Sequence, residues 1–244
     1  MSDAPDVVRA AAPPIRGIEP VSLGAWAGRI ATVVYLPGCN LDCPACPVAY
    51  LKPRATAGGT IPVDGVLDAI YSRRRWIEGI VVRGGEPFVH AELFDFLETL
   101  AELAIPIRLL TNGTYPDALG RVIEEGLVDE VALELRGPLD AGYAARAGTP
   151  VELGAIFRSI ELLLAAESGG ARVRCEFRIE YDGRALSGDD VLRAARTLTG
   201  ARRLVLAGTD GVRGELLSLA RRAEAWVGRC VVEGIRAAPE ASLV

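Results

Sequence analysis

Three cysteines lie close together early in the chain, at Cys39, Cys43 and Cys46, in the spacing Cys-x3-Cys-x2-Cys. Three thiolates on one short loop can bind three irons of a [4Fe–4S] cluster. Clusters that only carry electrons are normally held by four cysteines. A loop that offers three therefore leaves the fourth iron open to another ligand.

A zinc site is the alternative interpretation of these cysteines. Structural zinc takes four ligands, and its loops usually carry Cys-x2-Cys pairs. The single His, His90, is expected at the surface beside a helix start, and Cys175 and Cys230 fall in apolar segments expected in the core. A fourth zinc ligand is therefore hard to place, and the pattern favours the iron–sulfur cluster.

The loop that carries Cys39, Cys43 and Cys46, the cysteine loop, must be positioned by the strand before it. An apolar run predicts this strand at residues 29–36. Similar runs predict strands at residues 79–82, 106–110, 130–135, 172–181 and 203–207, with 230–232 as a short last strand. Helical spacing predicts helices at residues 62–75, 91–103, 116–125, 151–167, 187–198 and 212–226. Residues 139–150 are expected to form a loop. This alternation implies parallel βαβ units of an α/β fold, either a doubly wound sheet or an incomplete barrel.

Polar and glycine-rich residues follow the ends of these strands. Residues 84–87 (Gly-Gly-Glu-Pro) end the second strand, and residues 111–113 (Thr-Asn-Gly) end the third. Glu134 and Arg136 end the fourth strand, and Arg178 lies late in the fifth. In α/β folds these ends meet on one face, where ligands bind. We therefore expect a single site assembled from these loops.

The residue types at this face suggest how a ligand would be held. Gly84 and Gly85 would let the main chain approach a ligand closely. Glu86 would accept a hydrogen bond from an ammonium group. A barrel-facing Arg178 would need an anionic partner such as a carboxylate.

Composition limits the classes of function. The chain has 244 residues, 50% of them hydrophobic, which suits one large domain, and its net charge of −5 argues against free nucleic acid as a partner. No apolar run approaches membrane-spanning length and no signal peptide is visible, so we expect a cytoplasmic protein that does not contact a membrane. Residues 1–17 are expected to be a flexible arm, and residues 18–244 a single domain.

The cysteine spacing, with Gly-Gly-Glu-Pro one βα unit later, resembles the radical S-adenosylmethionine superfamily. Within it, residues 26–46, 83–87, 109–113 and 126–136 resemble the activating enzymes of glycyl-radical enzymes, such as those of anaerobic ribonucleotide reductase and pyruvate formate-lyase. The resemblance implies a partial (β/α)6 TIM-like barrel, with cluster and cofactor at the C-terminal ends of the strands.

The resemblance also implies roles for individual residues. Cys39, Cys43 and Cys46 would ligate the cluster, whose fourth iron would take the amino and carboxylate groups of S-adenosylmethionine. That amino group would be held by Gly84, Gly85 and Glu86. The candidates for the ribose and carboxylate contacts are Asn112, Glu134, Arg136 and Arg178.

The implied reaction is reductive cleavage of S-adenosylmethionine to methionine and a 5′-deoxyadenosyl radical, which takes a hydrogen atom from the substrate. For an activating enzyme, the substrate is a glycine of a partner glycyl-radical enzyme, and the electron comes from a donor such as flavodoxin or ferredoxin. The short chain has no added ferredoxin-like domain, so we expect a barrel open to a large partner.

Several positions depart from the family's pattern. Ala45 stands where an aromatic residue usually precedes the third cysteine, and residues 47–48 are Pro-Val where many activators have His-Asn. Leu110 replaces an acidic residue, and Glu134 and Arg136 replace Asp and Lys. An exchange of Lys for Arg changes the geometry of a bidentate contact. These changes would suit the alternative, a radical S-adenosylmethionine enzyme that modifies a small molecule or a peptide.

Overall fold

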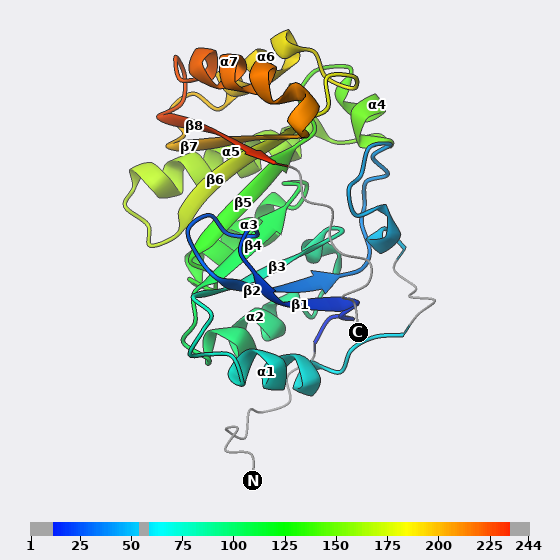
Figure 1. Cartoon of the computed structure of the whole chain (residues 1–244), viewed down its shortest axis with the longest axis vertical. Coiled ribbons are helices and arrows are strands. Elements are labelled where there is room, and N and C mark those ends of the chain that lie inside the picture. Colours follow the sequence, from blue (N-terminus) through cyan, green and yellow to red (C-terminus); the bar gives the residue numbers. More distant parts are fainter. Residues whose placement is uncertain (1–11, 54–58, 235–244) are drawn as a thin grey trace.

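The computed structural model describes residues 12–53 and 59–234, which form one sheet of eight strands that stand side by side in chain order (Figure 1). The strands are β1 (Gly17–Ser22), β2 (Ala31–Leu36), β3 (Gly79–Gly84), β4 (Ile107–Thr111), β5 (Glu130–Leu135), β6 (Arg174–Tyr181), β7 (Arg203–Gly208) and β8 (Arg229–Gly234). Strand β1 is antiparallel to β2, and every later pair is parallel. A doubly wound sheet reverses its strand order at a switch point. The order here never reverses, so the sheet is that of a barrel.

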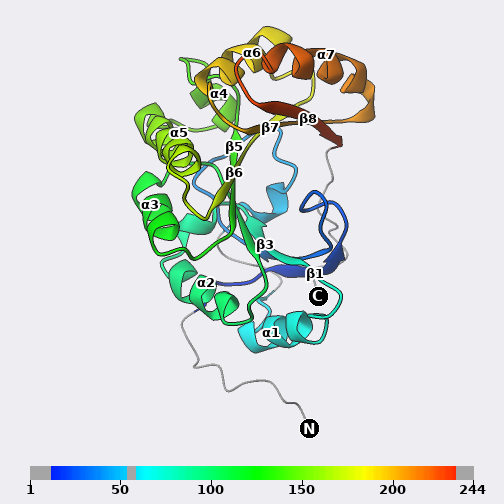
Figure 2. The same ribbon diagram turned by 90° about the vertical axis from the view of Figure 1, so that its left-hand side faces the viewer.

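Helices cover the outer side of the curved sheet (Figure 2). The crossover helices are α1 (Val63–Tyr71), α2 (Leu93–Ala101), α3 (Pro116–Glu124), α5 (Leu153–Ser168), α6 (Gly188–Thr197) and α7 (Arg213–Ala223). In α2 the buried residues Leu93, Phe96, Leu97 and Leu100 recur at helical spacing, which gives one apolar face to bury. The predicted partial (β/α)6 barrel is confirmed. In the described part of the chain, no helix combines the length and apolar character needed to cross a bilayer.

The inner face of the barrel has two chemically different halves. Side chains of β2 to β5 form an apolar cluster that includes Val33, Val81 and Leu110. In β6 the alternation is different, because Phe177 and Ile179 join the main core. The residues that alternate with them, Glu176, Arg178 and Glu180, are charged. The second half of the barrel interior is therefore lined by ion pairs.

Three parts of the structure differ from the sequence prediction. Strand β1 was not predicted. Residues 12–17 are not a loose arm, since Ile15 is 1% exposed and pairs with Ile61. The rest of the predicted arm, residues 1–11, lies outside the described residues. Residues 139–150 contain a helix, α4 (Tyr143–Ala147), which at five residues is too short to show a helical period. Strand β8, in contrast, confirms the predicted last strand.

Candidate functional site

The three cysteines lie on the loop between β2 and the short turn η1 (Ala49–Leu51), at the C-terminal ends of the strands (Figure 1). Cys43 is buried, and Cys39 and Cys46 are half-buried. All three line one pocket, together with side chains or main chain of Lys52, Arg83, Gly84, Gly85, Glu134 and Arg136. The structure thus brings together the cysteine loop and the ends of β3 and β5, as the sequence predicted.

A zinc site and a [4Fe–4S] cluster require different arrangements of the three thiols. Among the described residues, no group of three or more His, Cys, Asp or Glu side chains is placed to hold one metal ion. A zinc ion needs four donors around one point. A [4Fe–4S] cluster binds each thiolate on a different iron, so its ligands surround it instead of converging. Ligation of a cluster by these thiols stays the prediction of the cysteine spacing.

The glycine pair at the end of β3 packs against the cysteine loop. The Gly85 amide donates to the Leu36 carbonyl oxygen at 3.0 Å, and the Glu86 amide donates to the Gly38 carbonyl oxygen at 2.8 Å. A Cβ atom on Gly85 would lie 1.9 Å from that Gly38 oxygen. The lack of a side chain at Gly85 thus lets the end of β3 pack directly against the main chain that carries Cys39.

Glu86 lies behind the pocket instead of lining it. Its side chain is 0% exposed and accepts hydrogen bonds from the Asn112 amide at 2.7 Å, the Thr111 hydroxyl at 2.9 Å and the Phe88 amide at 3.2 Å. Burial raises the pKa of Glu86 to about 7. Through these contacts Glu86 joins the ends of β3 and β4, and its contact with an ammonium group of a ligand stays a prediction.

Asn112 reaches the cysteine loop through a second polar side chain. Its Nδ2 donates to Asn40 Oδ1 at 2.9 Å, while its Oδ1 accepts from the amide and the hydroxyl of Thr114 at 3.0 and 2.7 Å. Asn40 Nδ2 also donates to the Thr114 hydroxyl at 2.8 Å. The loop after β4 therefore holds the cysteine loop between Cys39 and Cys43, a role for Asn40 that the sequence did not reveal.

Two further contacts hold the start and the middle of the cysteine loop. His90 is buried, not at the surface as predicted, and its Nε2 lies 2.5 Å from the Pro37 carbonyl oxygen. At the other side the Asp42 amide donates to the Ala147 carbonyl oxygen of α4 at 2.9 Å. A Cβ atom on the following Gly148 would lie 1.8 Å from the Asp42 oxygen. The helix missed by the sequence analysis is thus part of the site.

Charged side chains form the wall of the pocket opposite the cysteines. Arg136 lies 3.3 Å from both Glu134 and Glu180, and Arg83 lies 3.8 Å from Glu134. Within the described residues, the buried Nε atoms of Arg83 and Arg136 have no hydrogen-bond partner. Two guanidinium groups with unused donors can bind a carboxylate. Arg83, which stands directly before Gly84, was not among the residues predicted for the site.

The protonation states in the pocket follow from burial and from these charges. Burial raises the pKa of Cys39 to about 11 and also raises that of Cys46. Metal binding to such thiols must therefore release protons. Although burial opposes it, Arg136 and Arg83 hold the pKa of Glu134 below its usual value. Glu134 is thus held ionised, whereas burial and the neighbouring Glu134 charge raise the pKa of Glu180 on the same wall.

Arg178 lies deeper in the barrel than the sequence suggested. It has the predicted carboxylate partners, since its Nη1 donates to Glu176 at 2.7 Å and its Nη2 donates to Glu233 at 3.1 Å. It does not appear among the residues that line the cysteine pocket. The structure therefore joins Arg178 to the interior ion pairs, and its contact with the ribose or carboxylate of a ligand stays a prediction.

A second, mostly apolar pocket of about 180 Å³ adjoins the first and shares Cys43 and Arg136 with it. Its lining comes from the cysteine loop and from the ends of β5 and β6: Ala45, Pro47, Leu135, Tyr181 and Leu186. The small side chain of Ala45 stands at this pocket. A flat, largely apolar group bound beside the cysteines would fit here.

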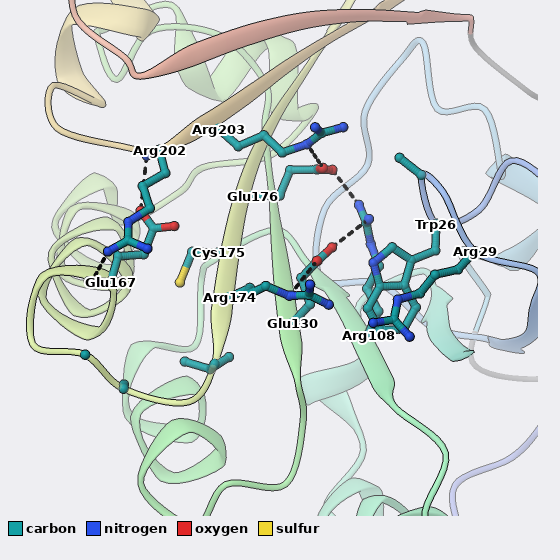
Figure 3. Close-up of a pocket in the computed structure, with 14 residues that line it drawn as sticks. Trp26, Arg29, Arg108, Glu130, Glu167, Arg174, Cys175, Glu176, Arg202 and Arg203 are labelled. Atoms are coloured by element: carbon teal, nitrogen blue, oxygen red, sulfur yellow. Dashed lines mark hydrogen bonds and ion pairs between the residues drawn. The ribbon is translucent and has the colours of Figure 1, made fainter. Parts of the chain in front are cut away.

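A larger cavity of about 370 Å³ lies at the amino-terminal ends of the strands and shares no lining residue with the pocket of Cys39, Cys43 and Cys46. Figure 3 shows the side chains that line this cavity. At its edge Arg29 and Arg174 lie 4.7 and 6.0 Å from the ring of Trp26. In its centre, buried Arg108 reaches Glu130 at 2.7 Å and Glu176 at 2.5 Å. In barrel enzymes this end serves stability, and the paired charges here agree with that role.

Glu176 is expected to contribute strongly to stability. It lies within 2.7 Å of three guanidinium groups, those of Arg108, Arg178 and Arg203. Burial opposes the shift, but these groups lower the pKa of Glu176 to about 2. Because the folded-state pKa is depressed, the stabilisation is complete above the unfolded pKa near 4.5 and is lost as pH falls towards 2.

Urea unfolding of Glu176→Gln at pH 7 should therefore show a loss of about 3–5 kcal/mol, since the change leaves buried cations without their anion. The difference from wild type should narrow as pH falls below 4.5. The control Glu152→Gln removes an exposed partner 3.8 Å from Arg158 and should cost less than about 1 kcal/mol. Equal losses in the two variants would contradict a special role for the interior network.

Comparison with known proteins agrees with the geometry. Residues 33–218 match the model of the Radical SAM superfamily. The chain is 26% identical over 128 residues to the "Putative glycyl-radical enzyme activating enzyme" of Methanocaldococcus jannaschii. The aligned stretch covers 52% of this chain and 51% of that protein. It is 31% identical over 93 residues to 7-carboxy-7-deazaguanine synthase of Synechocystis sp., covering 38% and 43%. The chain thus spans about half the length of the curated relatives it matches.

Among solved structures, a radical SAM methyltransferase from Sphaerobacter thermophilus superposes with a TM-score of 0.64 at 18% identity. The superposition covers 86% of this chain and 68% of the methyltransferase. At this identity the likeness concerns the fold. The match to the family model extends over most of the strands and helices described above. On that match the chain belongs to the radical S-adenosylmethionine superfamily, and with it come the family's cofactors, a [4Fe–4S] cluster and S-adenosylmethionine.

Proposed function

We propose that this protein activates a glycyl-radical enzyme by removing a hydrogen atom from a glycine of that partner. The observation that carries the proposal is the open barrel. Within the described residues, the sheet runs from β1 to β8 without closing, and the cysteine pocket lies at the C-terminal ends of its strands. A loop of a large partner could enter along this open side. The likeness to the Methanocaldococcus jannaschii protein supports the same assignment.

In this proposal Cys39, Cys43 and Cys46 hold the cluster. Arg83 and Arg136, whose Nε atoms lack partners among the described residues, take the carboxylate of S-adenosylmethionine. The apolar pocket beside Ala45 takes the adenosine and shields it from water. The bound cofactors supply a radical by reductive cleavage of S-adenosylmethionine, and the protein orients them and the substrate.

A direct test uses the anaerobically reconstituted protein, S-adenosylmethionine, a flavodoxin or ferredoxin donor, and a candidate glycyl-radical enzyme whose glycines carry deuterium on Cα. We expect a glycyl signal in the electron paramagnetic resonance spectrum of the partner. We also expect deuterium in the released 5′-deoxyadenosine, because that molecule receives the abstracted atom.

The matched control is a partner in which the radical-bearing Gly is replaced by Ala. It should give neither the signal nor the label. Release of methionine and unlabelled 5′-deoxyadenosine, with no protein radical in any partner tested, would contradict the activating role while leaving the family membership intact.

A second candidate function is the modification of a small polar molecule. It is favoured by the charged inner wall near the site, where Arg136 lies between Glu134 and Glu180. Such a wall would hold a substrate that carries both acceptor and donor groups. The similarity to 7-carboxy-7-deazaguanine synthase, over 38% of this chain, points in the same direction. Label transfer from a deuterated metabolite to 5′-deoxyadenosine in the absence of a partner protein would support this alternative.

A further inference from the structure

The segment after the cysteine loop folds back onto its beginning. The Gly38 amide donates to the Leu51 carbonyl oxygen at 2.7 Å, and the Cys39 amide donates to the Lys52 carbonyl oxygen at 3.2 Å. Leu51 is fully buried and anchors the segment. The main chain of Lys52 is therefore held in a fixed position beside Cys39.

The side chain of Lys52 makes a second connection to the same loop. Its Nζ donates to the Cys43 carbonyl oxygen at 2.7 Å and to Asp42 Oδ1, also at 2.7 Å. Lys52 lines the pocket that contains all three cysteines. Its side chain is 23% exposed, whereas that of Asp42 is 76% exposed. Water therefore screens the Asp42 charge more than the Lys52 charge, and of this pair Lys52 lines the pocket while Asp42 does not.

The composition of the chain adds an independent argument for lysine at this position. Lys52 is the single Lys among 27 basic residues, and all the others are Arg. An ammonium is a compact charge with three donors that can point in different directions, whereas a guanidinium is a planar fork. A carbonyl oxygen and a carboxylate on two successive residues of a tight loop suit the ammonium.

We infer that Lys52 positions the cysteine loop and raises the reduction potential of the cluster by placing a positive charge beside it. The inference rests on ligation of the cluster by Cys39, Cys43 and Cys46, and it holds for any substrate. Reduction adds one negative charge to the cluster, and a nearby cation stabilises that charge. Net charge and hydrogen bonds around a cluster are known to set its potential. Lys52 thus makes the cluster easier to reduce by the donor.

The test compares wild type with Lys52→Gln, Lys52→Arg and Asp42→Asn by a redox titration monitored by electron paramagnetic resonance, with iron counted per chain. Gln can still donate to the Cys43 oxygen but carries no charge. We expect Lys52→Gln to bind the cluster and to lower its midpoint potential. At a fixed potential the reduced-to-oxidised ratio should fall about tenfold, which is about 59 mV for one electron. Lys52→Arg should restore most of the shift, and Asp42→Asn should stay at or slightly above wild type.

The inference is overturned if Lys52→Gln has the midpoint potential and the iron content of wild type. If Lys52→Gln fails to bind iron, the potential of Lys52→Arg decides: a wild-type midpoint in its iron-loaded fraction supports the role of the charge, and a midpoint lowered by about 59 mV overturns it. Failure of wild type itself to form a cluster would instead contradict the ligand assignment. A second readout uses the apo protein, in which Lys52 carries the only side-chain amine that an amine-reactive reagent can label. Loss of labelling on cluster assembly is expected, and equal labelling before and after assembly would count against the contact.

Discussion

Replacement of any one of Cys39, Cys43 and Cys46 by Ala should leave a folded protein that no longer retains its iron or cleaves S-adenosylmethionine. The three thiols line one pocket, so each removal takes away one of the three ligands that the described loop offers. Changes in groups that only support metal ligands already cost about 10–100-fold. Loss of a ligand should therefore lower cleavage by more than about 100-fold. Iron, sulfide and zinc analysis after anaerobic reconstitution, with the visible spectrum, measures the effect.

Cys175 and Cys230 provide the matched controls, because both are buried outside the pocket. Cys175→Ala and Cys230→Ala should keep full iron content, with only the small stability loss of a truncated core side chain. Full iron content in one of the loop variants would remove that residue from the ligand set. Stoichiometric zinc in place of iron and sulfide in the wild-type protein would overturn the cluster assignment as a whole.

Gly85→Ala is the second change for which we expect a large effect. The added Cβ would lie 1.9 Å from the Gly38 oxygen and 3.1 Å from the Cys39 Cβ, so either the cysteine loop or the end of β3 must move. The atoms in its way are mostly main chain, which cannot rotate aside as a side chain can. We expect a stability loss of about 1–3 kcal/mol and a clear loss of iron per chain. Urea unfolding of the apo protein and iron analysis after reconstitution separate the two effects.

Gly214→Ala is the control for this change, because a Cβ at Gly214 in α7 would meet nothing within 4 Å. Replacing a helical Gly by Ala at an open position should be neutral or stabilise by up to about 1 kcal/mol. Iron content should be that of wild type. If Gly85→Ala behaved like Gly214→Ala in both measurements, the packing of β3 against the cysteine loop would not matter for the cluster.

Residues of the motifs beside the cysteines form hydrogen bonds that hold the cysteine loop in place. Glu86 joins the end of β3 to the end of β4, and Asn112 joins the end of β4 to Asn40. Lys52 and the end of α4 hold the loop from its other sides. A loop fixed at so many points keeps its thiols in place before the metal arrives, which lowers the cost of ordering them on binding.

Much of the fold could be predicted from the sequence because its signals are local. A buried strand is an apolar run, an amphipathic helix repeats every three to four residues, and each can be recognised without the rest of the chain. Where the signal was weak, the prediction failed: β1 includes the charged Glu19 and is followed by Gly24 and Gly28, and α4 has only five residues. The side of the sheet on which ligands bind also followed, since the ends of parallel strands share one edge.

The sequence by itself predicted cluster chemistry for Cys39, Cys43 and Cys46, because residue type and spacing along a single loop are local properties. It also placed that loop beside the ends of β3 and β5. Only the tertiary structure decided which polar side chains face the pocket and which support it. Glu86 and Arg178 proved to be bonded within the protein, while Arg83 and Lys52 joined the cysteines. These outcomes depend on partners tens of residues away, and the burial and orientation that bring such partners together are set when the whole sheet curves and packs.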